Sequence, residues 1–178
     1  MLFIHPRRII SSALPRLRKW FWLRYCRGQF KSYGVNLLIN GKSHFNGHVE
    51  VGDDCNFNGM YIQGGGNVKI GNNFHSGIEC MMITSKHNYD KGDAIPYDYT
   101  AYATDIEIGD YVWFGNRVTI VGPVKIGKGA VIGTCAVITK DVPDYAIMGG
   151  LNKVLKYRDI DHFQQLEKTG KVWKYINN

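Results

Sequence analysis

Apolar residues recur every six positions through the second half of the chain. From residue 106 onward the larger ones are Ile108, Phe114, Ile120, Ile126, Ile132 and Ile138. Positions six apart lie about 240° apart around an α-helix and share no face, whereas an even spacing keeps side chains on one side of a β-strand. The period therefore predicts short strands with one buried row of side chains.

Glycine follows four of these six positions, at Gly109, Gly115, Gly127 and Gly133. We expect the glycines to form tight corners between strands, and the β-branched residues to favour the strands themselves. The pattern also occurs earlier, in "VEVGDD" from Val49 and "VKIGNN" from Val68. Repetition at a fixed period indicates a solenoid, in which each coil packs its apolar row on the next.

One segment interrupts the repeat, because 26 residues separate Met82 from Ile108. We predict a loop at about 85–104 that projects from the rigid coil, with His87 near its start. The loop contains tyrosines and aspartates that suit a sugar, since flat rings stack on pyranose faces and carboxylates accept hydroxyl hydrogen bonds. Alternatively, the same side chains hold the fold of the loop itself. They are Tyr89, Tyr97, Tyr99, Tyr102, Asp90, Asp93 and Asp98.

The formal charge of +7 comes from the N-terminal segment. Residues 1–49 contain nine Lys/Arg and no acidic residue, and the remainder carries −2. A basic face spread over the fold is therefore absent, and we expect no nucleic-acid partner. The segment is too interrupted by charge for a membrane span or a signal peptide. It either packs as a helix on the end of the core or attaches to an anionic membrane surface through Trp20, Phe21 and Trp22.

The four cysteines show no CxxC pair and no short regular spacing. Neither a zinc knuckle nor a disulfide scaffold is indicated, so we interpret them as reduced residues of a cytoplasmic protein.

Together, the hexads, the looped histidine, "VWFGNRVTIVGPVKIGKGAVIG", "VITKDVP" and the final "KYR" resemble the hexapeptide-repeat acetyltransferases. Within them, the nearest subset is the sugar and polysaccharide O-acetyltransferases of the maltose and galactoside acetyltransferase group. The resemblance covers roughly residues 48–158. It implies a mainly β fold, a left-handed parallel β-helix with three hexads per coil, assembled as a homotrimer with acetyl-CoA between neighbours.

On this basis we divide the chain into three parts. Residues 1–32 form a basic, amphipathic N-terminal segment, residues 33–157 the β-helix domain with loop 85–104 inserted, and residues 158–178 a short C-terminal helix and tail.

His87 is the candidate general base. It follows Gly71 by 16 residues, an interval that resembles the family's spacing from an "IG-x-N" hexad to the catalytic histidine. Imidazole titrates near ~6.5, so a neutral ring can accept a hydroxyl proton. Asp90 or a backbone carbonyl is expected to hold the other ring nitrogen. Asn58 matches an acceptor-side position of the family, or else satisfies the backbone of a corner. The expected acceptor contacts are Asn58, Asp90 and Tyr97.

The resemblance also implies contacts to acetyl-CoA. Trp113 points outward because Phe114 takes the inward position, and the family places its tryptophan at the subunit interface near the cofactor. Basic side chains near the last coil suit the 3′-phosphate. The sequence departs from the family here, with "GGLNK" in place of "GGNPAK". The expected cofactor contacts are Trp113, Gly115, Asn116, Gly133, Thr134, Thr139, Lys140 and Lys153.

These features predict an acetyl-CoA-dependent O-acetyltransferase that acts on a sugar hydroxyl in cell-surface polysaccharide biosynthesis, in the cytoplasm or at the inner membrane surface. We expect no metal, because the histidine spacing that a zinc-binding trimeric β-helix would need, two residues five apart plus one distant, is absent. The alternatives are another acceptor (an amino sugar, serine or a xenobiotic) or a non-catalytic trimeric scaffold.

Overall fold

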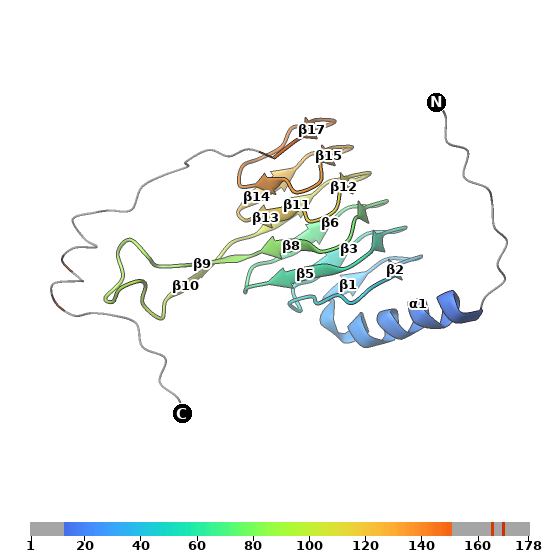
Figure 1. The fold of residues 1–178 in the computed structure, drawn as a ribbon, viewed down its shortest axis with the longest axis horizontal. Helices are drawn as coiled ribbons and strands as arrows, with labels where there is room; N and C mark the ends of the chain where they lie inside the picture. The colour runs from blue at the N-terminus through green and yellow to red at the C-terminus, as the bar shows by residue number, and fades with distance from the viewer. Residues whose placement is uncertain (1–12, 151–164, 166–168, 170–178) are drawn as a thin grey trace.

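The computed structural model describes residues 13–150 together with Gln165 and Thr169. It consists of one N-terminal helix, a solenoid of parallel strands and a projecting hairpin (Figure 1). The expected fold class, a mainly β parallel solenoid, is confirmed. The domain boundary at 157 lies outside the described residues, as does the predicted C-terminal helix and tail apart from Gln165 and Thr169.

Three parallel sheets form the walls of the solenoid, and we name them in the order in which each coil visits them. The first face contains β1 (Ser32–Tyr33), β3 (Val49–Val51), β6 (Val68–Ile70), β11 (Ile106–Ile108) and β14 (Val124–Ile126). The second face contains β2 (Leu38–Ile39), β4 (Asn56–Phe57), β7 (His75–Ser76), β12 (Trp113–Phe114), β15 (Val131–Ile132) and β17 (Ile147–Met148). The third face contains β5 (Met60–Gln63), β8 (Cys80–Ile83), β13 (Thr119–Val121) and β16 (Val137–Ile138).

The predicted buried row is confirmed, because all six residues of the six-residue period are buried in the core. Strand register aligns equivalent positions of successive coils, so that Ile70 lies beside Ile108 and Ile108 beside Ile126. Phenylalanines of neighbouring coils also pack on one another, with ring centroids of Phe74 and Phe114 5.0 Å apart. Each coil therefore buries its apolar side chains against those of the next.

The glycines after the buried residues have a different role from the one predicted. A Cβ on Gly71 would lie 2.4 Å from Asp110 Oδ1 and 2.8 Å from Asp110 N in the next coil. Left-handed backbone at the corners is adopted mostly by other residues, namely Asn36, Asp54, Asn73, Glu79, Tyr111, Arg117, Cys135 and Tyr145. Glycine at these positions thus permits the close approach of coils, which a side chain would prevent.

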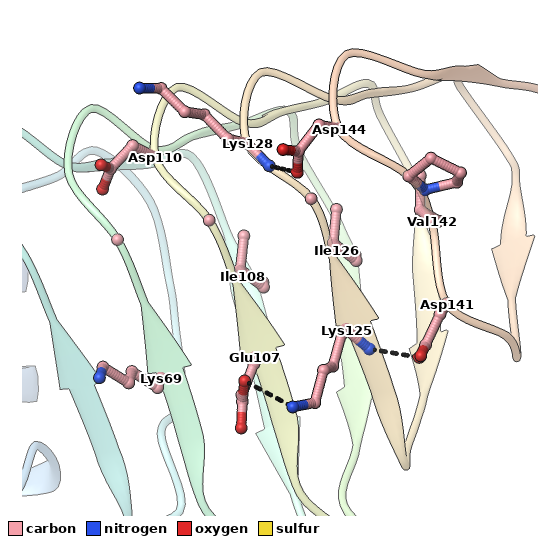
Figure 2. Close-up of a pocket in the computed structure, with 14 residues that line it drawn as sticks. Lys69, Glu107, Ile108, Asp110, Lys125, Ile126, Lys128, Asp141, Val142 and Asp144 are labelled. Carbon is pink, nitrogen blue, oxygen red and sulfur yellow. Dashed lines mark hydrogen bonds and ion pairs between the residues drawn. The ribbon is translucent and has the colours of Figure 1, made fainter.

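Aspartate and asparagine side chains lock the corners between the first and second faces. Asp110 Oδ1 accepts a hydrogen bond from Asn72 N at 2.7 Å. In the same way, Asp144 Oδ1 accepts one from Lys128 N at 2.8 Å, and Figure 2 shows this bond. Each oxygen occupies the space beside the glycine of the previous coil, as Asp110 does beside Gly71. The corner sequence of glycine followed by a polar residue is therefore a packing requirement between coils.

The outward side of the first face is a ladder of alternating charge. Glu50, Lys69, Glu107 and Lys125 occupy equivalent positions in successive coils. Lys125 Nζ lies 3.3 Å from Glu107 Oε2 (Figure 2). Such exposed pairs contribute little to stability, and they mark this face as solvated.

The hairpin leaves the solenoid at the corner between the third and first faces. Its base consists of β9 (Ser85–His87), paired antiparallel with β10 (Ala101–Ala103). The predicted loop at 85–104 is therefore confirmed as an excursion from the coil, and Figure 1 shows it extending sideways from the end of β8.

Helix α1 (Ala13–Cys26) and the short helix η1 (Arg27–Gln29) cover the N-terminal end of the solenoid (Figure 1). Trp22 and Leu23 pack against the core, and the buried Cys26 Sγ donates to Ser43 O at 3.4 Å. Trp20, Phe21 and Tyr25 remain exposed. The helix thus packs on the end of the core and also presents an aromatic surface outward. No described helix has the length and apolar character that a membrane crossing requires.

Candidate functional site

His87 is the last residue of β9, where it is exposed on the projecting hairpin. Its ring stacks on Tyr97, with ring centroids 4.2 Å apart and planes inclined by 23°. Tyr97 was expected to contact an acceptor, and the structure places its ring on one face of the imidazole. The imidazole therefore contacts an aromatic neighbour on one face while the His87 side chain stays exposed to solvent.

The hairpin tip is organised around the buried carboxylate of Asp98, which is 6% exposed. Asp98 accepts hydrogen bonds from Thr100 N at 2.8 Å, Asp93 N at 3.2 Å and Asn88 Nδ2 at 3.4 Å. Burial alone raises the pKa of the Asp98 carboxyl, but these hydrogen bonds outweigh it, so the pKa lies below its usual value. Asp98 is consequently ionised at neutral pH.

Three other tyrosines of the hairpin face solvent, namely Tyr89, Tyr99 and Tyr102. Tyr99 is the most exposed of them, at 80%. Asp90 is half-buried in the turn beyond His87. Asp98 therefore holds the fold of the loop, as one interpretation of its composition predicts, and contact of the tyrosine rings with a sugar stays a prediction.

Asn58 lies at the corner between β4 and β5 and forms part of the solenoid wall. Its Nδ2 donates to Ser76 O at 2.6 Å, and its Oδ1 accepts from Asn40 Nδ2 at 2.9 Å. These contacts match the corner role rather than a free amide. The corner begins the third face, whereas His87 follows the opposite end of that face, so the chain does not bring Asn58 and His87 together.

Five of the expected cofactor contacts lie on or beside the corner between the second and third faces. Trp113 points outward from β12 and is 54% exposed. Gly115 stacks under the next coil, because a Cβ there would lie 2.7 Å from Thr134 N. The five residues are Trp113, Gly115, Asn116, Gly133 and Thr134, and we call them the corner strip.

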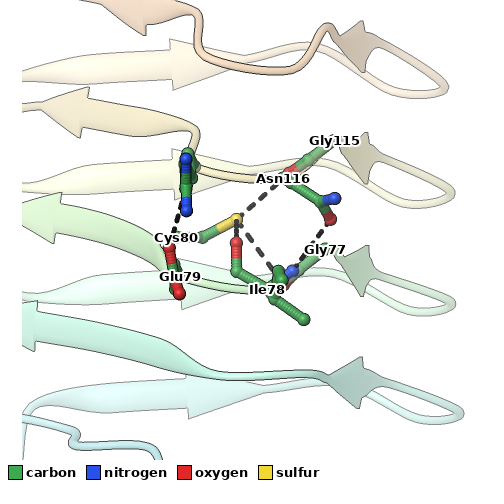
Figure 3. Close-up of polar contacts among 7 residues, drawn as sticks. Gly77, Ile78, Glu79, Cys80, Gly115 and Asn116 are labelled. Atoms are coloured by element: carbon green, nitrogen blue, oxygen red, sulfur yellow. Dashed lines mark hydrogen bonds and ion pairs between the residues drawn. The ribbon is translucent and has the colours of Figure 1, made fainter.

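Hydrogen bonds make this corner rigid. Asn116 Oδ1 accepts from Ile78 N at 3.1 Å, and the buried Cys80 Sγ donates to Gly115 O at 3.2 Å (Figure 3). Burial raises the pKa of the Cys80 thiol. Across neighbouring coils, Arg117 Nε donates to Glu79 Oε2 at 2.7 Å. Asn116 therefore has a structural role that its sequence pattern did not indicate.

Thr139 and Lys140 lie elsewhere, directly after β16 at the end of the third face. The hairpin leaves from the same edge of the solenoid, two coils earlier. Within one chain, Thr139 and Lys140 thus lie on the same edge of the solenoid as His87, at the end of the third face. The corner strip lies on a different edge, between the second and third faces. Lys153 lies outside the described residues.

Two hollows in the described surface lie away from His87. One of about 690 Å³ follows the charged first face and is lined by Lys69, Glu107 and Asp144 (Figure 2). The other, of about 660 Å³, lies beside α1 and includes His44 and Asn58. In the latter, His44 stacks on Tyr61 with ring centroids 5.0 Å apart. Among the described residues no group of three His, Cys, Asp or Glu side chains is arranged to hold a metal ion.

Comparisons with known proteins agree with this architecture. Residues 105–140 match the bacterial transferase hexapeptide family, described as six repeats. A chloramphenicol acetyltransferase from Morganella morganii is 52% identical over 89 residues, which are 42% of this chain and 42% of that protein. The chain spans 42% of the length of this relative and of a chloramphenicol acetyltransferase from Klebsiella aerogenes, and 51% of the length of a putative acetyltransferase from Schizosaccharomyces pombe.

Two solved structures share the fold. A hexapeptide-repeat acetyltransferase from Vibrio cholerae O1 biovar eltor, complexed with acetyl coenzyme A, has a TM-score of 0.63 and 25% identity over 75% of each chain. A galactoside acetyltransferase in complex with coenzyme A has a TM-score of 0.53 and 18% identity over 87% of each chain. Residues 105–140 thus carry the bacterial transferase hexapeptide repeat, and the chain shares its parallel β-solenoid fold with hexapeptide-repeat acetyltransferases.

Proposed function

We propose that the protein is an acetyl-CoA-dependent O-acetyltransferase that acetylates a sugar hydroxyl, with His87 as the general base. The observation that carries this proposal is the placement of His87. An exposed imidazole, stacked on Tyr97, stands on the hairpin that leaves the hexapeptide-repeat solenoid in the described part of the chain. The hairpin lifts the ring clear of the flat walls of the coil, where a donor and an acceptor can meet it.

The chemistry needs only this base and hydrogen-bond donors. A ring nitrogen of His87 accepts the acceptor's hydroxyl proton while the oxygen attacks the thioester carbonyl carbon. A backbone N–H stabilises the tetrahedral oxyanion. Its collapse breaks the carbon–sulfur bond, and the His87 imidazolium returns the proton to the departing thiolate. The products are the acetyl ester and coenzyme A, with no covalent enzyme intermediate.

A neighbouring copy completes the proposed site. The third face separates the corner strip from the hairpin, and the four residues of β8 span about 13 Å. One chain therefore presents His87 and Trp113 on different edges. A homotrimer would place the hairpin of one subunit over the corner strip of the next, with acetyl-CoA between them.

Trp113 tests this assembly, because more than half of its side chain is exposed in the single chain. Trp113→Glu should dissociate the trimer in sedimentation experiments and abolish turnover, whereas Trp113→Phe should preserve both. A trimeric, active Trp113→Glu variant would contradict the shared site.

For the acceptor, the exposed tyrosines of the hairpin support a sugar, because aromatic rings stack on pyranose faces. The acetylated sugar would belong to a cell-surface polysaccharide. A xenobiotic hydroxyl is the second candidate, since several curated relatives are named chloramphenicol acetyltransferase. Thiol release from acetyl-CoA should be measured with nucleotide sugars, polysaccharide fragments and chloramphenicol. Turnover with chloramphenicol alone would overturn the sugar assignment.

A non-catalytic scaffold would retain only the fold. Titration calorimetry with coenzyme A separates the two, because an acetyltransferase binds coenzyme A and a scaffold does not. Absence of binding to the assembled protein would therefore overturn the proposed function.

We also propose a cytoplasmic protein that contacts the inner membrane surface through α1. The packed side of the helix holds Trp22 and Leu23, so Trp20 and Phe21 are free to enter a lipid interface beside the basic residues of the segment. The double variant Trp20→Ser/Phe21→Ser should lose co-sedimentation with anionic liposomes at low salt and keep turnover with a soluble acceptor. A full-length protein that ignores such liposomes would contradict the proposal.

A further inference from the structure

The hairpin tip connects His87 to a buried anchor. Asn88 directly follows His87, and Tyr97, whose ring stacks on the imidazole, directly precedes Asp98. Asn88 is joined to His87 by the backbone, and Tyr97 contacts its ring. Both residues therefore lie at the Asp98 hydrogen-bond network, directly beside the imidazole.

The Asp98 carboxylate ties together three separate parts of the tip. Its Oδ1 accepts from Thr100 N, on the return toward β10. Its Oδ2 accepts from Asp93 N in the turn and from Asn88 Nδ2 beside the base. Two oxygens thus hold three donors, which only a carboxylate satisfies. The amide of an asparagine would present N–H groups to one of the two backbone donors.

Further contacts close the same network. Asn88 N donates to Thr100 O at 3.2 Å, and Asn88 Oδ1 accepts from Lys91 N at 3.3 Å. Gly92 runs tightly against it, because a Cβ there would lie 2.7 Å from Asn88 O and 2.7 Å from Asp98 Oδ2. The tip is therefore a compact unit built on Asp98, although it lies outside the solenoid core.

We propose that Asp98 is a positioning residue for His87, whose buried carboxylate fixes the hairpin tip and thereby holds the Tyr97 ring against the imidazole. The inference rests on the proposed role of His87 as general base. Asp98 itself does not touch the reacting atoms. Its effect reaches the reaction through the orientation of the imidazole, to which proton transfer is sensitive.

The test compares Asp98→Asn with the control Lys91→Gln. Both remove one charge from the same turn, but Lys91 contributes to the network only through its backbone N–H, which glutamine keeps. Asp98→Asn should lower kcat by roughly 10-fold or more, with KM for acetyl-CoA and calorimetric coenzyme A affinity within about twofold of wild type. Lys91→Gln should change none of these values.

A second variant reaches the same network by a different route. Gly92→Ala places a methyl group against Asp98 and Asn88, so it should reproduce the fall in kcat at unchanged KM for acetyl-CoA. If Asp98→Asn and Gly92→Ala had the same kcat as the Lys91→Gln control and wild type, the proposal would be overturned. Loss of coenzyme A binding in Asp98→Asn would overturn it as well. An active His87→Ala variant would instead refute the proposed function, so the two failures are distinguishable.

Discussion

The stacking of coils predicts a large effect for one added methyl group. In Gly71→Ala, the Cβ would lie 2.4 Å from Asp110 Oδ1 and 2.8 Å from both Asp110 N and Gly109 C. These atoms belong to the backbone of the next coil and to the Asp110 carboxylate that is hydrogen-bonded at its corner. The methyl group can therefore be accommodated only if the two coils move apart. Overpacking of this kind costs about 1–3 kcal/mol. Weakening of the bond from Asn72 N to Asp110 Oδ1 adds about 1 kcal/mol, so we expect a loss of about 2–4 kcal/mol.

Gly65→Ala is the matched control, because nothing lies within 4 Å of a Cβ at Gly65. Its free energy of unfolding should stay within about 0.5 kcal/mol of wild type. Both variants should be unfolded with denaturant at one fixed protein concentration, since the unfolding transition of the proposed homotrimer would depend on protein concentration. Equal transition midpoints for Gly71→Ala and Gly65→Ala would refute the argument that glycine is required at position 71 by the close contact between coils.

Three further predictions concern the core, the thiols and the hairpin. Phe114→Ala should lower the free energy of unfolding by about 3–5 kcal/mol, and Phe114→Leu by less, because the ring is fully buried against its neighbours; denaturant unfolding measures both. Burial raises the pKa of Cys26 to about 11, so at neutral pH iodoacetamide should label the exposed Cys135 first, as peptide mass spectrometry would show; equal labelling of Cys26 would contradict this. Because the pKa of Asp98 is lowered in the folded protein, its stabilisation of the hairpin should be present above about pH 4 and lost as the pH falls through that lowered pKa. Amide hydrogen exchange at the hairpin tip should then become equal in wild type and Asp98→Asn in acid. A wild-type tip that keeps its exchange protection in acid would contradict the prediction.

The solenoid could be predicted from the sequence because its information is local and repeated. The buried residues and the excursion at 85–104 follow from a single period, and strand register confirms them. The coil that contains β3, β4 and β5 is one residue longer than the regular coil of β11, β12 and β13, because 19 residues separate Val51 from Ile70. Compared with the regular coil, this coil has two more residues at the turn near Gly64 and one fewer at the corner before β5.

The arrangement of the hairpin could not be predicted in the same way. The spacing of tyrosines and aspartates in the loop has no period, so it does not indicate that Tyr97 faces His87 or that Asp98 is the buried anchor. Asn58 and Asn116 show a different limit. The resemblance predicts ligand contacts for both residues, whereas their side chains hydrogen-bond the backbone of the adjacent coil. A sequence motif at a solenoid corner therefore does not separate a ligand contact from a structural contact.

The most direct test of the account is the steady-state kinetics of His87→Ala, measured together with calorimetric binding of coenzyme A and with the exposed His48→Ala as control. If His87 is the general base, kcat should fall by roughly 10²–10⁴-fold, a barrier increase of about 3–5 kcal/mol. Coenzyme A affinity and melting temperature should stay unchanged, because His87 lies on the hairpin and supports no part of the core. A His87→Ala variant with a kcat within about fivefold of wild type would contradict the central claim.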